Sequence, residues 1–546
     1  MKKKVVKKII KETKPKMEIK DFTNILAKMK IEWTKKEKKM EFPKFSVSEK
    51  FIVVELPSGK EIDFKYHLIR DSAIAHLKYD KDKKELIYNV IEPILTKEEI
   101  EIYKKIIGAL LEVLDVELSA IKKREETVIY LEKKIQEILT EYDIKLNKES
   151  YLKIMYFVYR NFVGLNEIEP ILHDPYVEDI SCDGTGIPIY IVHRKYGSIK
   201  TNLVYNDADV LRQFVVKLAE RCGRFISYAE PLLDGTLPDG SRVQASFSAD
   251  VTTRGPTFTI RKFVEEPLSP IDIMNSGTAS SEVLAYLWLA VESGASILVG
   301  GGAATGKTTF LNALSMFIPP QAKIVSVEDT RELNIPHDNW IPSVTRAGFA
   351  KGYGEVTMFD LLKEAFRQSP NYVIVGEVRG EEAYVMFQGM AAGMPAMGTM
   401  HAGKVEDIIN RLQTPPINLA PSLIETLDIV IIMVHAKEKG ESARRVKEII
   451  EIEEIDSKTG SVRTNKAYNW LPSEDIFESR GYSWLLQEIS KLRGESADDL
   501  QKELMRRKKI LEWMQKNKIS NFKDVVGMIS EYYRNPEKVL KQAKIK

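Results

Sequence analysis

The sequence has little cysteine and no long apolar run, and each shortage excludes a class of protein. Only two of its 546 residues are cysteines, Cys182 and Cys222, too few for a disulfide framework and without the CxxC spacing of a structural zinc site. We therefore expect a reduced, cytoplasmic setting. No apolar run approaches the roughly 18 residues that a membrane-spanning helix needs. The lysine-rich start is not followed by the apolar segment of a secretory signal, so any work at a membrane is expected at its inner surface.

Net charge is also small, at +2, so the composition gives no reason to expect a nucleic-acid partner. The charge is unevenly spread, because residues 1–40 contain fifteen lysines against five acids. This basic arm (residues 1–45) is either a solvated extension or an electrostatic contact for an anionic membrane or an acidic partner. The chain is 44% hydrophobic and 29% charged, which is typical of a globular protein.

Hydrophobic patterning divides the chain into regions of different character. They are a basic arm at 1–45, a β-hairpin (51–66) plus helical subdomain at 46–164, an α+β domain at 165–270, an α/β domain at 278–440, and a C-terminal β-hairpin with helices at 441–546. Helices of the subdomain are expected at 99–114, 127–141 and 149–163. The α/β domain alternates helices with apolar strands at 297–299, 324–327, 372–375, 396–400 and 429–433. That alternation predicts a mainly parallel sheet covered by helices.

The most informative motif is Gly301-x4-Gly306-Lys307-Thr308, a phosphate-binding loop pattern between an apolar strand and an amphipathic helix. Glycines let backbone N–H groups approach phosphate oxygens, and the helix N-terminus adds positive charge. Lys307 is expected to reach the β- and γ-phosphates and the Thr308 hydroxyl to bind Mg²⁺. The candidate nucleotide-binding residues of the loop are Gly301, Gly302, Ala303, Ala304, Thr305, Gly306, Lys307, Thr308 and Thr309.

Three other apolar strands lead into polar residues that could complete a hydrolytic site. Glu377 is a candidate to hold Mg²⁺ or position water, and Glu328 is a candidate general base, because a carboxylate beside Mg²⁺ can deprotonate water. His401 is a candidate to sense the γ-phosphate. Arg367 and Arg379 flank Glu377 and are candidates to neutralise phosphate charge, within one subunit or across an interface. The alternative for the two arginines is an ordinary surface salt bridge.

These segments occur in the order seen in a known family. The phosphate loop, VEDTREL (327–333), VIVGEVRG (373–380) and GTMHAG (398–403) together resemble the secretion-superfamily ATPases of type II and type IV secretion, type IV pili and the archaellum. The resemblance covers about residues 151–477. RLQTPPINL (411–419) and LPDGSRVQ (237–244) are most similar to the archaeal branch. The tetracysteine zinc element of many bacterial members is absent from the sequence.

The resemblance implies a RecA-like P-loop NTPase domain with a mainly parallel sheet, preceded by an α+β (PAS-like) domain and an N-terminal helical subdomain. It implies ATP and Mg²⁺ as cofactors, with Thr308 and Glu377 as metal ligands. It also places Arg242 and Arg261 at the nucleotide, in the cleft between the domains. Its members are typically hexameric homo-oligomers that dock on a polytopic membrane platform protein.

The sequence therefore predicts a Mg-dependent ATPase whose cytoplasmic ring drives assembly or rotation of a type IV pilus-like filament. One alternative is a type IV secretion or DNA-uptake traffic ATPase, because the sequence does not identify the cargo. Another is an ATP-binding regulatory module with little turnover. Extension versus retraction, pilus versus archaellum, and the choice of Glu328 or Glu377 as general base are left open by the sequence.

Overall fold

The chain divides into two compact units. A computed structural model describes residues 42–47, 54–57, 59, 61–69, 72–113, 124–263, 266–346, 354–438, 441–455 and 462–545. Most of the basic arm therefore lies outside the described residues. One unit comprises residues 1–55, 65–75 and 91–173, and the other comprises 56–64, 76–90 and 174–546.

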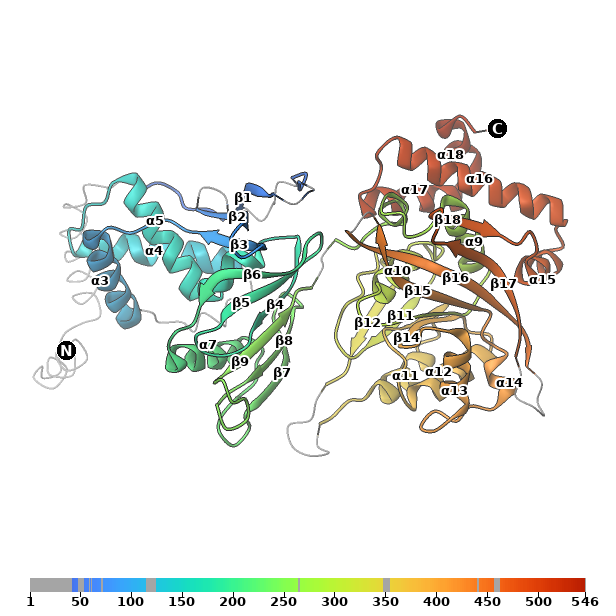
Figure 1. The fold of residues 1–546 in the computed structure, drawn as a ribbon, viewed down its shortest axis with the longest axis horizontal. Helices are drawn as coiled ribbons and strands as arrows, with labels where there is room; N and C mark the ends of the chain where they lie inside the picture. The colour runs from blue at the N-terminus through green and yellow to red at the C-terminus, as the bar shows by residue number, and fades with distance from the viewer. Residues whose placement is uncertain are drawn as a thin grey trace, which may run out of the picture. The chain divides into compact units, whose positions relative to one another are not determined.

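The first unit is mainly helical, and its helices occur where the sequence predicts them (Figure 1). In α4, Leu131, Ile135 and Ile138 are buried at spacings of three and four residues, the apolar stripe of an amphipathic helix. Asn147 caps α5 by accepting a hydrogen bond from the backbone N–H of Ser150. The elements are α3 (Lys97–Val113), α4 (Arg124–Glu141), α5 (Lys148–Val158), a π-helical turn (Tyr159–Val163) and α6 (Glu169–Leu172).

A nine-stranded sheet has the order β1-β2-β3-β6-β5-β4-β9-β8-β7. Helix α7 (Ala208–Arg221) packs on it, with the ring of Phe214 5.1 Å from that of Phe258. The strands are β1 (Asp63–Ile69), β2 (Ala73–Asp80), β3 (Glu85–Ile91), β4 (Val177–Cys182), β5 (Pro188–His193), β6 (Gly197–Val204), β7 (Leu232–Thr236), β8 (Arg242–Ser246) and β9 (Thr257–Arg261).

The first hairpin lies later in the chain than the sequence analysis places it. Residues 51–53 are outside the described residues, and residues 54–57 form no strand. Strand β1 instead pairs with β2. Ala73, Ala75 and Leu77 are fully buried at alternate positions of β2, which gives β1 an apolar partner in the sheet.

The α/β domain is built on a second nine-stranded sheet, in the order β12-β11-β13-β14-β10-β15-β16-β17-β18. The strands from β12 to β15 in this order are parallel to one another, as the sequence predicts. They are β10 (Ile297–Gly301), β11 (Ile324–Glu328), β12 (Trp340–Val344), β13 (Tyr372–Val375), β14 (Ala396–Met400) and β15 (Ile429–Glu438). The sequence analysis missed β12, an edge strand that contains Pro342 and has no fully buried residue.

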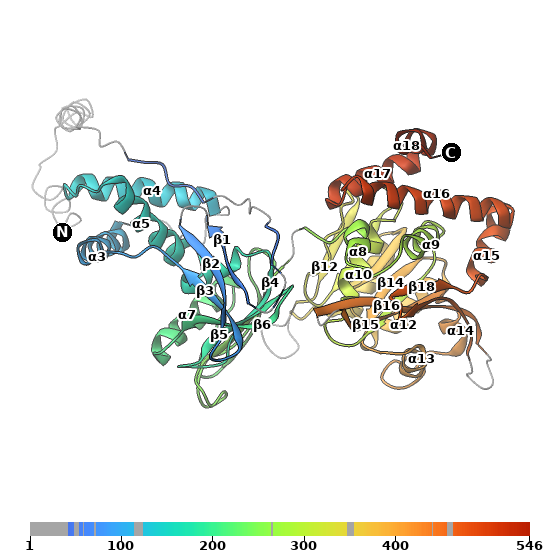
Figure 2. The same ribbon diagram turned by 45° about the horizontal axis from the view of Figure 1, so that its top comes forward.

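Helices cover both faces of this sheet (Figure 2). Two apolar core clusters, one on each face, hold them there. One face carries α8 (Pro270–Asn275), α9 (Ser281–Glu292) and α10 (Lys307–Ser315). The other carries α11 (Met358–Arg367), α12 (Glu382–Ala391), α13 (Val405–Gln413) and α14 (Pro421–Ile424). The predicted α/β class is confirmed.

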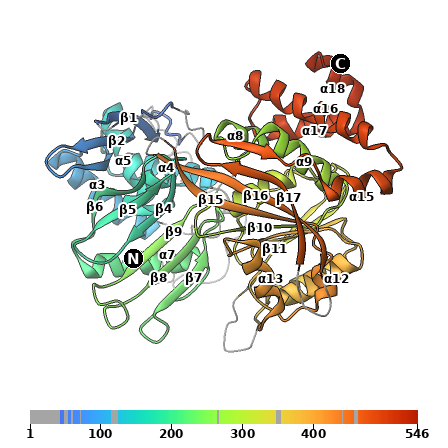
Figure 3. The ribbon, with the colours of Figure 1, turned by 45° about the vertical axis from the view of Figure 1, so that its right-hand side comes forward.

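The C-terminal region extends the same sheet and then covers it. Antiparallel strands β16 (Glu441–Ile455), β17 (Val462–Leu471) and β18 (Ile476–Ser479) continue from β15 (Figure 3). They are followed by α15 (Trp484–Arg493), α16 (Ala497–Lys516), α17 (Phe522–Arg534) and α18 (Pro536–Ala543), and α16 packs along α9. In the part of the chain that the structure describes, no helix combines the length and apolar character of a membrane span.

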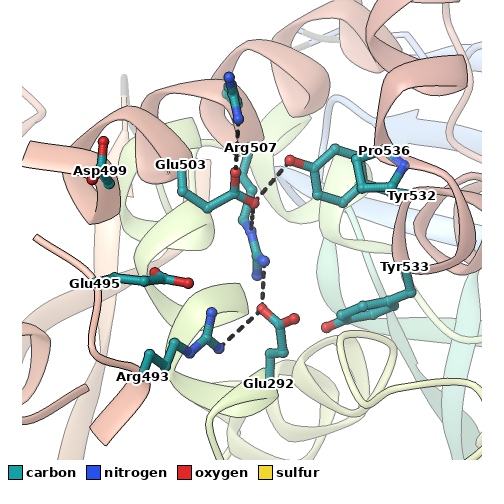
Figure 4. A pocket seen from close by; sticks show the side chains of 10 residues that line it. Glu292, Arg493, Glu495, Asp499, Glu503, Arg507, Tyr532, Tyr533 and Pro536 are labelled. Atoms are coloured by element: carbon teal, nitrogen blue, oxygen red, sulfur yellow. Dashed lines mark hydrogen bonds and ion pairs between the residues drawn. The ribbon is translucent and has the colours of Figure 1, made fainter. Parts of the chain in front are cut away.

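A buried ion pair fastens α16 to α9 (Figure 4). Arg507 is 2% exposed, and its guanidinium pairs with Glu292 of α9 and, at 3.0 Å, with Glu503. It also lies 4.9 Å from the ring of Trp288, a distance that favours a cation–π interaction. Helix α16 is thus held on α9 by an ion pair as well as by apolar packing.

Replacing Arg507 with Met is expected to destabilise the protein by about 1.5–3 kcal/mol, because the carboxylate of Glu292 would lose its buried partner and keep only Arg493, 3.4 Å away. Arg506→Met is the matched control, since the Arg506 side chain is 46% exposed and its ion pair with Glu503 is long, at 3.7 Å. This substitution should lower the free energy of unfolding by about 1 kcal/mol or less. Urea unfolding of both variants measures the difference. Equal losses of unfolding free energy in the two variants would show that the buried ion pair stabilises the protein no more than the exposed one.

Candidate active site

The phosphate loop joins β10 to α10 and is held by its own side chains. Gly306, immediately before α10, has a φ of +88°, and Ala304 has a φ of +56°. The left-handed region suits glycine but costs a residue with a Cβ about 1–2 kcal/mol, so Ala304 is strained. The hydroxyl of Thr305 and the ammonium of Lys307 both donate to the carbonyl of Gly302, at 3.0 and 2.8 Å. The loop thus combines a helix N-terminus with a lysine, the two features that attract phosphate.

Glu377, two residues after β13, is a charged carboxylate beside this loop. Burial opposes its ionisation, but the hydrogen bond and charge of Arg379, together with the charges of Lys307 and His401, lower its pKa. Arg379 also lies 3.7 Å from Asp329. A carboxylate held ionised at this position has the charge needed to bind a divalent cation.

The pKa of Glu328, the last residue of β11, is shifted in the opposite direction to that of Glu377. Glu328 is 2% exposed, and burial raises its pKa to about 7, although backbone hydrogen bonds work against the rise. One oxygen, Oε1, accepts from the N–H groups of Glu332 and Leu333, at 2.9 and 3.0 Å. The other, Oε2, finds no hydrogen-bond partner among the described residues. Glu328 can therefore take up and release a proton near neutral pH. Its oxygen Oε2 is the atom that could accept that proton.

His401 directly follows β14, the strand between β10 and β13. Its side chain is exposed and lies near enough to act electrostatically on the Glu377 carboxylate, as Lys307 does. Parallel strands present their carboxyl ends at one edge of a sheet. The structure therefore brings the phosphate loop, Glu377 and His401 together, with Glu328 at the end of the next strand.

The two arginines that flank Glu377 in the sequence have different surroundings. Arg379 pairs with the Glu377 carboxylate. Arg367 ends α11, where its side chain is 80% exposed and pairs with Glu364 at 3.9 Å. A role for Arg367 at the phosphate of a neighbouring subunit stays a prediction.

Arg242 on β8 and Arg261 on β9 face each other in the antiparallel ladder. Each pairs with a carboxylate of its own sheet: Arg242 with Asp234 at 3.0 Å, and Arg261 with Asp179 at 3.2 Å. The structure thus places the two arginines directly opposite each other on neighbouring strands. Their contact with nucleotide stays a prediction.

The donor atoms at the loop suit Mg²⁺. This ion usually keeps several waters and takes one or two protein oxygens in addition to phosphate oxygens. The half-buried hydroxyl of Thr308, in the first turn of α10, and the ionised carboxylate of Glu377 are oxygen donors of that kind. When bound, Mg²⁺ would offset the negative charge of the phosphates.

One residue at the loop was missed by the sequence analysis. Arg444, on β16, donates from Nε to the carbonyl of Ala304 at 3.2 Å, across 140 positions of the chain. No motif or spacing links the two segments. Arg444 reaches the loop because β16 lies next to β15, which pairs with β10.

The chain is similar to known proteins over most of its length. The model of the family "Type II/IV secretion system protein" matches residues 164–467. An uncharacterized protein of Methanocaldococcus jannaschii is 40% identical over 470 residues, 82% of this chain and 85% of that protein. Type IV secretion system protein PtlH of Bordetella pertussis is 31% identical over 269 residues, 43% of this chain and 79% of PtlH. The X-ray structure of the ATPase DotB of Legionella pneumophila matches at 13% identity with a TM-score of 0.38, covering 66% of this chain and 92% of that one.

Glu328→Gln is expected to remove a pH dependence of stability. Because the pKa of Glu328 rises from 4.5 to about 7 on folding, its protonated form favours the native state. That stabilisation is complete below about pH 4.5 and is lost as the pH rises to about 7, a change of about 3 kcal/mol. Gln keeps an oxygen for the two backbone N–H groups but cannot ionise. Between pH 5 and pH 8, the free energy of unfolding should therefore fall by about 2–3 kcal/mol more in the wild type than in the variant.

Unfolding in urea at both pH values tests this expectation. Glu364→Gln is the control, because its side chain is 60% exposed and its charge is not among those that shift the pKa of Glu328, so it should follow the wild-type profile. Parallel profiles for the wild type and Glu328→Gln would contradict the burial argument.

Proposed function

The chain belongs to the type II/IV secretion system protein family, and on this premise we propose that it is a Mg-dependent ATP hydrolase of the secretion-motor type. The observation that carries the proposal is the gathering of Lys307, Glu377 and His401 at one edge of the parallel sheet. A phosphate-binding cation, a metal-binding carboxylate and a polar group at the terminal phosphate are the parts that phosphate-loop hydrolases use.

We assign different roles to the two carboxylates because their pKa values are shifted in opposite directions. Glu377 is held ionised by Arg379 and is assigned to the metal, with Thr308. Glu328 has a pKa near 7 and an oxygen with no hydrogen-bond partner in the described part of the chain, and is assigned as the base that takes the proton of the attacking water. Two acids whose environments shift their pKa values apart are a recurrent sign of separate roles. Lys307 would bind the β- and γ-phosphates and His401 the terminal phosphate.

We further propose that the active form is a homo-oligomeric ring, a hexamer, that works at the inner face of the membrane on a polytopic platform protein. Arg367 supports an oligomer, because an arginine that is four-fifths exposed at the end of α11 can reach a neighbouring subunit. The proposed output is assembly or rotation of a type IV pilus-like filament, as in the archaeal branch, and the relative in Methanocaldococcus jannaschii supports that branch.

A second candidate output is secretion. The similarity to PtlH, which is named as a type IV secretion system protein, favours it. Both outputs require the same hydrolysis, so the first experiment addresses hydrolysis itself.

The rate of Mg-dependent ATP hydrolysis per subunit is expected to rise with protein concentration, because an oligomer completes the site. Glu377→Gln should lower the rate by about 100-fold or more, because the charge that develops on the transferring phosphate would be stabilised less well, while ATP binding persists. Glu101→Gln is the control: Glu101 is a 66% exposed carboxylate of α3 that pairs with Lys104, and its loss should leave the basal rate of the free protein unchanged. A near-zero wild-type rate with intact ATP binding would instead support a regulatory module, or a motor that needs its platform. Adding membranes that contain the platform protein separates these two.

The basic arm is proposed to contact the membrane or its platform. Deleting residues 1–40 is expected to weaken sedimentation with platform-containing membranes, with a larger loss at low salt, where charges are less screened. Nucleotide affinity should not change. A full-length chain with the arm sequence scrambled but its charge kept should still bind. Equal membrane binding by the deleted and intact proteins would contradict the proposal.

A further inference from the structure

Arg444 reaches the phosphate loop because the C-terminal hairpin extends beyond the end of β10. In the parallel pair of β10 and β15, Gly301 lies opposite Met433. Strand β15 then continues beside β16 (Figure 3), and its His435 is the register partner of Arg444. Arg444 is thus beyond the carboxyl end of β10, where the loop begins.

Two contacts fix Arg444 on the loop. Its Nε donates to the Ala304 carbonyl at 3.2 Å. Its Cδ lies 3.1 Å from the point where a Cβ on Gly306 would be, so the aliphatic part of the side chain covers this glycine. Arg444 therefore touches both residues of the loop that have a positive φ.

We propose that Arg444 is a positioning residue for nucleotide binding, which holds Ala304 in its left-handed conformation and so keeps the loop in the shape that receives phosphate. A strained backbone persists only where its surroundings over-determine it. A hydrogen bond from a guanidinium is stronger than one from a neutral donor. A loop already set in its bound shape does not have to be ordered when nucleotide binds. The inference rests on the proposed function, because it concerns the same loop.

A double-mutant cycle separates this role from direct contact with phosphate. Ala304→Gly removes the strain, because glycine adopts a positive φ freely. If Arg444 acts by holding Ala304, Arg444→Gln should weaken binding of fluorescent methylanthraniloyl-ADP with Mg²⁺ by about tenfold in the wild type. In the Ala304→Gly background the same change should weaken binding by about twofold or less.

Steady-state hydrolysis gives a second readout. A residue that shapes the loop affects the ground state and the transition state alike, so Arg444→Gln should raise KM and leave kcat nearly unchanged. Arg463→Gln is the matched control. Arg463 is a 70% exposed arginine of β17 in the same sheet, paired with Glu453 at 2.6 Å, and its loss should change neither quantity.

An equal loss of affinity in both backgrounds would overturn the inference, because it would mean that Arg444 binds the phosphate itself. No loss in the wild-type background would also overturn it. Failure of the wild-type protein to bind the probe would defeat the proposed function, and this inference with it. That outcome differs from the others because it appears before any substitution is made.

Discussion

The candidate site depends on how closely two strands approach the end of β10. A Cβ on Gly300 would lie 2.9 Å from the carbonyl oxygen of Ala402, and one on Gly301 would lie 2.8 Å from that of Met433. Both obstacles are backbone atoms, which cannot turn aside as a side chain can. Because the chain just after β14 and strand β15 lie this close to the end of β10, any larger residue at these two positions would push them away. The loop therefore leaves the sheet between the strand that leads to His401 and the strand that leads into the Arg444 hairpin.

The same edge of the sheet supports two carboxylates in different charge states. Glu377 has cations on several sides, so its charge is stabilised although it is partly buried. Glu328 has only backbone N–H donors on one oxygen, and burial dominates. A Cβ on Gly376 would lie 2.9 Å from Cγ of Glu328, so the glycine just before Glu377 also makes the room for Glu328. The missing side chain at Gly376 thus lets Glu328 be buried beside it, while the side chain of Glu377 stays 25% exposed.

Local patterns in the sequence predicted the parallel strands, because each is a short apolar run that ends in a glycine or a polar residue. They also predicted that Glu377 and His401 lie beside the loop, since neighbouring parallel strands end at one edge. Strand β12 was missed because Pro342 and its exposed side chains do not look like a buried strand. The burial of Glu328 and the contact of Arg444 with Ala304 depend on packing between distant segments. No local spacing encodes them.

The C-terminal helices belong to the same physical unit as the phosphate loop, although they lie beyond the residues 164–467 that the family model matches. Trp288 of α9 stacks on Phe317 at 5.4 Å and donates to the hydroxyl of Tyr533 at 2.9 Å. That hydroxyl in turn donates to the Phe317 carbonyl at 2.6 Å, just after α10. One end of α10 thus faces the nucleotide loop, and the chain at its other end is held by α17. Because buried side chains of β10, α10 and α16 share one core, and close-packed cores transmit displacement rather than absorb it, a shift of α10 on nucleotide binding would be passed on to the C-terminal helices.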